Sequence, residues 1–229
     1  MSASRVEETQ AEYGKNVATA SPAEDRVFLY NVSWETYERL LEERGECTNP
    51  RFAYDEGTLE IMSPHWKHEN AGALIGYFIC VLTEEFKLKR KSVMHMTCKR
   101  SDKERGLEPD GSFYIKNEAL MRGVTDLDLS IHPPPDLMIE IDISRSSMSK
   151  FGIYEALGVS EIWLYDGIEF QFFAWRKTKY EKFQESPTFP GVAIGEGIPR
   201  FIAESLKTDE ETLLANFRTW VRQQLEGKK

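Results

Sequence analysis

The chain has 229 residues, of which 41% are hydrophobic and 29% are charged, and its formal net charge is −9. This composition is typical of a globular protein that buries a core, and it argues against extensive disorder. The negative charge argues against a protein that coats nucleic acid without specificity. It does not exclude a nuclease, because a basic surface can lie beside an acidic metal pocket.

The cysteines and the apolar segments bear on the cellular location of the protein. Three cysteines without a CxxC pair form neither a disulfide framework nor a zinc site, so we expect a reducing, cytoplasmic location. Residues 1–25 are polar and mixed in charge, so they are expected to be a flexible tail without a signal peptide, followed by a single domain over residues 26–229. The longest apolar stretch, residues 71–82, is far shorter than the roughly 20 residues of a membrane-spanning helix.

The first half of the chain predicts two helices and a hairpin. Ser33 suits the N-cap of a short amphipathic helix of about ten residues. Two strand-like runs, 52–54 and 58–61, flank a turn at Gly57 and predict a hairpin. Apolar residues at helical spacing then predict a long helix over residues 68–86.

The second half predicts strands around one short helix. Four strands are expected at residues 92–98, 111–115, 136–143 and 161–165. A helix over residues 148–157, closed by Gly158, separates the last two of these strands. A hairpin at 170–175 and 180–183 and a C-terminal helix over 209–225 complete the order. This order predicts an α/β (α+β) fold with one central mixed sheet flanked by helices.

The predicted strand at 136–143 carries acids where a central strand should be apolar. Side chains alternate along a strand, so residues 137, 139, 141 and 143 share one face, and residues 138, 140, 142 and 144 share the other. The second face holds Glu140 and Asp142 beside Met138 and Ser144. Buried carboxylates are costly unless something pairs with them, and a metal ion is the expected partner.

A third acid, Asp110, starts a neighbouring predicted strand directly after Pro109. If the two strands pair, Asp110, Glu140 and Asp142 converge and offer hard oxygen ligands for Mg²⁺ or Mn²⁺. Lys150, near the start of the next helix, could then offset charge on a phosphate. Glu69, near the start of the long helix, is a further candidate ligand.

Each candidate also has a structural interpretation. Asp110 could mark only a turn, and Asp142 could pair with a backbone amide or a basic side chain. Lys150 could be a solvated helix lysine, and Glu69 a first-turn acid that favours the helix dipole. The basic stretch 87–105, with Lys99 and Arg100, is either a solvated face or a surface that contacts phosphates. The four histidines show no metal-ligand spacing, so none is assigned to a metal.

Four segments together resemble the Uma2 family (DUF820), which is abundant in cyanobacteria and is assigned to the PD-(D/E)xK nuclease superfamily. They are residues 107–115 (LEPDGSFYI), 134–144 (PPDLMIEIDIS), 147–154 (SMSKFGIY) and 156–163 (ALGVSEIW), and the resemblance extends over about 33–175. It implies a restriction-endonuclease-like fold in which Asp110 and Glu140 are the motif acids and Lys150 is a lysine displaced onto the helix. The sequence departs from the superfamily pattern at Asp142, which stands where the motif has its lysine.

The resulting hypothesis is a Mg²⁺- or Mn²⁺-dependent endonuclease that hydrolyses phosphodiester bonds in DNA. Asp110, Glu140, Asp142 and Lys150 would carry the reaction, and Lys99 and Arg100 would contact the nucleic acid. RNA is left open as a substrate, a homodimer is allowed, and no membrane partner is expected. The alternative is a catalytically inactive nucleic-acid-binding or interaction module that keeps the same fold.

Overall fold

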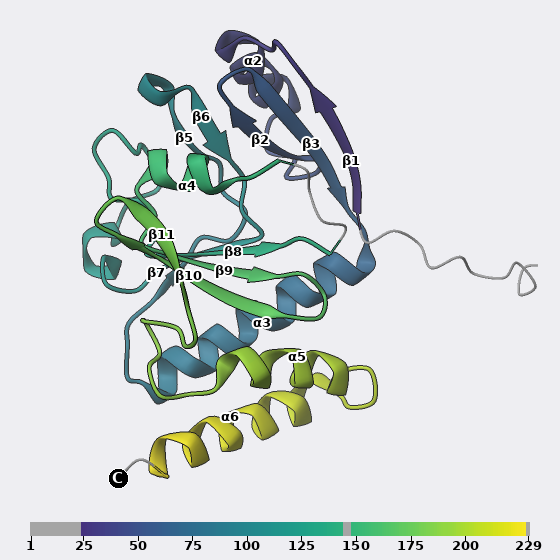
Figure 1. Ribbon diagram of the computed structural model, residues 1–229, viewed down its shortest axis with the longest axis vertical. Coiled ribbons are helices and arrows are strands. Elements are labelled where there is room, and N and C mark those ends of the chain that lie inside the picture. The colour runs from purple at the N-terminus through teal and green to yellow at the C-terminus, as the bar shows by residue number, and fades with distance from the viewer. Residues whose placement is uncertain (1–23, 144–147, 228–229) are drawn as a thin grey trace, which may run out of the picture.

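The chain folds around two β-sheets that meet at Asp110. The computed structural model describes residues 24–143 and 148–227. The first sheet has the strand order β1-β3-β2-β6-β5, and the second has the order β11-β10-β9-β8-β7-β4. Figure 1 shows the first sheet above the second, with α3, α5 and α6 below it.

The first sheet is antiparallel throughout. Its strands are β1 (Glu24–Leu29), β2 (Arg51–Asp55), β3 (Thr58–Pro64), β5 (Cys98–Arg100) and β6 (Arg105–Leu107). Its outer face packs on α2 (Trp34–Arg44), which begins where Ser33 Oγ accepts a hydrogen bond from the Thr36 amide. The core between them is aromatic, with the Tyr37 and Tyr54 rings stacked at 4.9 Å between centroids.

The second sheet is mixed, as the sequence predicts. Its strands are β4 (Lys91–Ser92), β7 (Gly111–Tyr114), β8 (Leu137–Ile141), β9 (Glu161–Tyr165), β10 (Phe170–Arg176) and β11 (Lys179–Phe183). Only β8 and β9 run parallel; the other neighbouring pairs of this sheet are antiparallel. The parallel pair is joined through α4 (Phe151–Leu157), which ends at Gly158 with a φ of 81°, a conformation that glycine adopts without a steric penalty.

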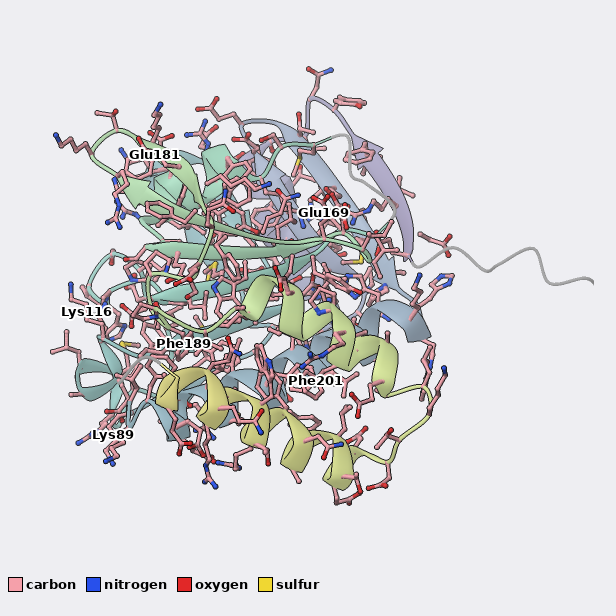
Figure 2. The ribbon with its side chains drawn as sticks, turned by 60° about the horizontal axis from the view of Figure 1, so that its bottom comes forward. Lys89, Lys116, Glu169, Glu181, Phe189 and Phe201 are labelled. Atoms are coloured by element: carbon pink, nitrogen blue, oxygen red, sulfur yellow. The ribbon has the colours of Figure 1, made fainter. Side chains whose placement is uncertain are left out.

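The helices divide between the two faces of the second sheet. The lower face, with Leu137, Ile139 and Ile141 of β8, packs on α3 (Trp66–Glu85), α5 (Ile194–Glu204) and α6 (Glu210–Glu226). The upper face, with Met138, packs on α4, which lies between the two sheets. Figure 2 shows Phe201 in the layer between α5 and α6, where its ring lies 5.1 Å from that of Phe217.

The predicted strand at 92–98 is wrong, because only its two end residues lie in strands and these strands belong to different sheets. β4 pairs with β7 in the second sheet, and β5 pairs with β6 in the first. The chain crosses between the sheets at residues 93–97, where Met94 has a φ of 44° and its carbonyl accepts a hydrogen bond from Ser112 Oγ. The sequence pattern therefore does not indicate the first sheet, which is separate from the predicted central one.

Further elements were not predicted. β1 begins at Glu24, two residues inside the expected tail, while residues 1–23 of that tail lie outside the described part of the chain. α5 contains Gly195, Gly197 and Pro199, which disfavour a helix in isolation. Short 3₁₀ helices occupy η1 (Ser101–Lys103) and η2 (Glu118–Met121). None of the helices described is long and apolar enough to cross a membrane.

Candidate active site

Asp110 lies at the junction of the two sheets, between β6 of the first and β7 of the second. Its backbone amide donates to the carbonyl of Ile139, at 3.1 Å, and its Oδ2 accepts from the amide of Ile141, at 2.7 Å. Its Oδ1 accepts from Nη1 of Arg51, the first residue of β2. Only 3% of Asp110 is exposed. The carboxylate is thus buried and fixed to both sheets.

His68, on the first turns of α3, forms a third link to Asp110. Its Nε2 lies 3.3 Å from Asp110 Oδ2 and 3.0 Å from the carbonyl oxygen of Ile141. Burial alone would lower the pKa of His68, but the charge of Asp110 and the hydrogen bond to it raise that pKa. Burial would likewise raise the pKa of Asp110, but His68 and then the charges of Arg51 and Lys150 hold it well below its ordinary range. Asp110 is therefore kept ionised.

Glu140 stands opposite Asp110 on the neighbouring strand. β7 and β8 pair antiparallel with Gly111 facing Ile139, so the same register, extended by one residue, places Asp110 across from Glu140. Burial raises the pKa of Glu140, and the negative charge of Asp110 adds to this rise because the two carboxylates repel each other. The predicted pairing of the two strands is therefore present, and it brings two acids together at one end of β7 and β8.

Lys150, at the N-cap of α4, reaches Glu140. Its Nζ lies 2.7 Å from Glu140 Oε2, and the two side chains are 14% and 6% exposed. The other oxygen, Oε1, is buried and has no hydrogen-bond partner among the described residues. Burial and then the Glu140 charge raise the pKa of the nearby Tyr154 hydroxyl well above its ordinary value. Oε1 of Glu140 is thus open to a further ligand or to the Tyr154 hydroxyl, which is also buried without a partner among the described residues.

Asp142 and Glu69 each accept a hydrogen bond from an arginine. Asp142 Oδ1 accepts from Nη2 of Arg26, at 3.0 Å, and Arg26 also binds Glu24 and Glu60. Glu69 accepts from Nη2 of Arg51. Within residues 24–143 and 148–227, no three His, Cys, Asp or Glu side chains converge as a metal site. The two strand acids Asp110 and Glu140 are therefore brought together, whereas Asp142 and Glu69 are held by arginines.

Lys99 and Arg100 lie on β5, at the edge of the first sheet. Lys99 Nζ is 2.7 Å from Glu38 Oε1, and Arg100 pairs with Asp102 at 2.7 Å. Both cations already have acidic neighbours, so a phosphate would compete with these for the basic groups.

Two cavities flank the pair of acids. The larger, of about 250 Å³, is bordered by Glu140, Asp142, Lys150 and Tyr154 together with apolar side chains. The smaller, of about 90 Å³, is bordered by Arg51, His68, Glu69, His95 and Asp110. Groups that could bind a cation or a phosphate therefore line both cavities, with Glu140 in the larger and Asp110 in the smaller.

The sequence pattern predicts Lys150 but not the other basic groups of this site, which are Arg51, Arg26 and His68. Arg51 and Arg26 come from strands of the first sheet, and a single sequence does not show which strands of one sheet meet the acids of another. His68 was tested only for ligand spacing along the chain, which its contact with Asp110 does not require. Its position four residues after Pro64, at the start of a long apolar helix, is a signal that it faces the interior.

Comparison with known families gives the site its context. The profile of the Uma2 family, described as "putative restriction endonuclease", matches residues 34–201. This chain belongs to the Uma2 family. A solved structure described as a "putative nuclease belonging to DUF820" from Anabaena variabilis ATCC 29413 is 18% identical, with a TM-score of 0.48. That similarity covers 83% of this chain and 99% of the other. No curated protein matches the Uma2 chain.

Proposed function

We propose that this Uma2 protein is a divalent-metal-dependent endonuclease that hydrolyses phosphodiester bonds in DNA. The observation that carries the proposal is the placement of Asp110 opposite Glu140 on paired strands, with the Lys150 ammonium 2.7 Å from Glu140. The family description supports a nuclease, and an acidic pair beside a cation suits phosphoryl chemistry.

The residues of the site fit Mg²⁺ or Mn²⁺. Asp110 is kept ionised, and Oε1 of Glu140 is a buried oxygen without a partner in the described part of the chain. Buried polar atoms of this kind call for a ligand, and carboxylate oxygens are those that hard divalent cations prefer. Asp110 and Glu140 would hold the ion, which would supply an activated water and neutralise charge on the phosphate.

The side chains of the protein would do the remaining work. Lys150 would offset negative charge that develops on the phosphate, because its ammonium is fixed beside Glu140 and partly exposed to the larger cavity. His68 would hold Asp110 and the end of β8 in place from α3. Asp142 would keep Arg26 close to the site, and Lys99 and Arg100 would contact the DNA backbone.

One observation favours the alternative, a catalytically inactive binding module. Oδ1 of Asp110 accepts from Arg51, and Oδ2 accepts from the Ile141 amide beside His68. A carboxylate with both oxygens bound to protein groups can serve structure alone. An inactive module would bind DNA through basic groups and would not require a metal. A cytoplasmic location and a homodimer stay predictions.

Cleavage of supercoiled plasmid tests the proposal. Wild type should nick it with Mg²⁺ or Mn²⁺ and not with EDTA, and Glu140→Gln should abolish nicking. Glu161→Gln is a matched control, because Glu161 is a buried acid on the next strand that accepts from Trp163, Ser186 and Thr188. This control should be less stable yet still cleave. Binding without cleavage under either metal would support the inactive module, and cleavage of RNA alone would replace the substrate.

A further inference from the structure

Each acid at the junction of the sheets has a basic partner from the chain itself. Arg51 binds Asp110 and Glu69, Lys150 binds Glu140, and Arg26 binds Asp142. Any divalent cation that binds here must therefore compete with fixed positive charges. Among these charges, the one on Arg51 holds two of the candidate acids at once.

Arg51 bridges elements that are far apart in the sequence. It starts β2 of the first sheet, whereas Asp110 directly precedes β7 of the second sheet and Glu69 lies in the first turn of α3. The Arg51 and Asp110 side chains are 5% and 3% exposed, but that of Glu69 is 46% exposed. The guanidinium thus extends from a buried acid to one in contact with solvent, along the wall of the smaller cavity.

A second arginine, Arg44, whose side chain is 11% exposed, pairs with an acid in a different way. Arg44 directs both of its Nη atoms at the one carboxylate of Glu108 and also donates to the Pro50 carbonyl. Glu108 accepts in addition from the Phe52 amide and the Thr97 hydroxyl. This two-point pairing on a single carboxylate is the strong geometry for arginine. Arg51 instead divides its two Nη atoms between two carboxylates, so either contact can break while the other persists.

We infer that Arg51 sets the affinity of the site for its divalent cation by competing for the Asp110 carboxylate. This inference rests on the proposed function. A cation bound to Oδ1 of Asp110 displaces the Arg51 guanidinium, which keeps Glu69 as its second partner. Glu69 is therefore an anchor for Arg51 and not a ligand of the ion. Removing the charge of Arg51 removes both the competing contact and the repulsion between two cations at one carboxylate.

The sign of the effect distinguishes this role from a structural one. If Arg51 only positioned Asp110, its loss would loosen the ligand and weaken cation binding. If Arg51 competes, its loss tightens cation binding. We expect Arg51→Gln, which can still donate a hydrogen bond but carries no charge, to bind Mn²⁺ at least about tenfold more tightly than wild type, or a difference of about 1.4 kcal/mol.

The Mn²⁺ affinity is measured by titrating the purified full-length protein with Mn²⁺. The titration is followed by calorimetry and by the electron paramagnetic resonance signal of free Mn²⁺. Arg51→Lys keeps the charge but contacts one carboxylate at a time, so its affinity should lie between those of wild type and Arg51→Gln. Arg44→Gln is the control; it loses a paired guanidinium whose side chain is 11% exposed, against 5% for Arg51, and should be less stable, with Mn²⁺ affinity within about twofold of wild type. Thermal unfolding confirms that each variant is folded.

The possible results separate the inference from the proposed function. Mn²⁺ binding by wild type with equal or weaker binding by Arg51→Gln overturns the inference and leaves the metal site in place. Binding by neither protein overturns both, and binding by the variant alone supports the inference. If Arg51→Gln does not fold, Arg51→Lys must bind Mn²⁺ at least twofold more tightly than wild type, or the inference fails. Glu69→Gln should weaken binding in wild type but not in the Arg51→Gln background; equal weakening in both would make Glu69 a ligand.

Discussion

Replacing Lys150 with methionine should lower the free energy of unfolding, because it leaves the buried Glu140 charge without its partner. The Lys150 and Glu140 side chains are 14% and 6% exposed and lie 2.7 Å apart, so the pair is largely shielded from water. Breaking a buried pair by removing one partner costs about 3 to 5 kcal/mol, because the other charge stays buried. Because Lys150 is partly exposed and methionine fills the space of its stem, we expect a loss of about 3 kcal/mol in the free energy of unfolding at pH 8.

The cost should depend on pH with a definite sign. Burial raises the pKa of Glu140 above its ordinary value of 4.5, and Lys150 opposes that rise. Without Lys150 the pKa rises further. A carboxyl whose folded-state pKa is raised contributes stability at low pH, and that contribution is lost as the pH rises through the folded-state pKa. The deficit of Lys150→Met relative to wild type should therefore be full at pH 8 and should shrink as the pH approaches 4.5.

Urea unfolding followed by tryptophan fluorescence at pH 8 and pH 4.5 measures the deficit. Lys150→Met combined with Glu140→Gln should recover most of the stability, because neither charge is then buried alone. Lys99→Met is the control; its pair with Glu38 is exposed, so the loss should stay below about 1 kcal/mol. An equal deficit at both pH values, with no recovery in the double variant, would mean that the lysine stem matters and its charge does not.

Three further predictions concern the metal, the nucleic acid and the fold. Mg²⁺ or Mn²⁺ should raise the melting temperature of wild type, and Glu140→Gln should reduce that rise; an undiminished response would remove Glu140 from the ligand set. Lys99→Ala with Arg100→Ala should weaken DNA binding and lower the slope of log affinity against log salt by roughly 0.9 for each lost phosphate contact, and an unchanged slope would make both residues part of a solvated face. Gly197→Ala should destabilise the protein by about 1 to 3 kcal/mol in urea unfolding, because a Cβ there would lie 2.3 Å from the Trp220 ring. Wild-type stability in that variant would contradict the packing of α5 on α6.

The central strand could be predicted because its pattern is local. Alternation along residues 137–141 places the aliphatic residues toward α3 and Glu140 on the opposite face, and both follow from a period of two. Asp110 could be placed at the start of a strand for the same reason. The pairing of that strand with β8 then followed from their expected adjacency in one sheet.

The separate first sheet and the two arginines, Arg51 and Arg26, could not be predicted because they depend on long-range contacts. The strand-like run at 92–98 gives no sign that its two ends belong to different sheets. Arg51 and Asp110 are 59 residues apart, and Arg26 and Asp142 are 116 apart. α5 was missed because Gly197 lowers local helix propensity, although the close approach of Trp220 requires a glycine there. Lys150 was a candidate from its place near the start of the helix, but only the family resemblance favoured it over a solvated lysine, because nothing in its local pattern distinguishes it from one.

A crystal structure with Mn²⁺ tests the central claim most directly. The account predicts an anomalous difference peak between Asp110 and Glu140, with carboxylate oxygens about 2.1 to 2.2 Å from the ion and the Arg51 guanidinium moved off Asp110 Oδ1. A peak at another place, or no peak at saturating Mn²⁺ with Arg51 and Lys150 still paired to the two acids, would contradict the metal-dependent mechanism.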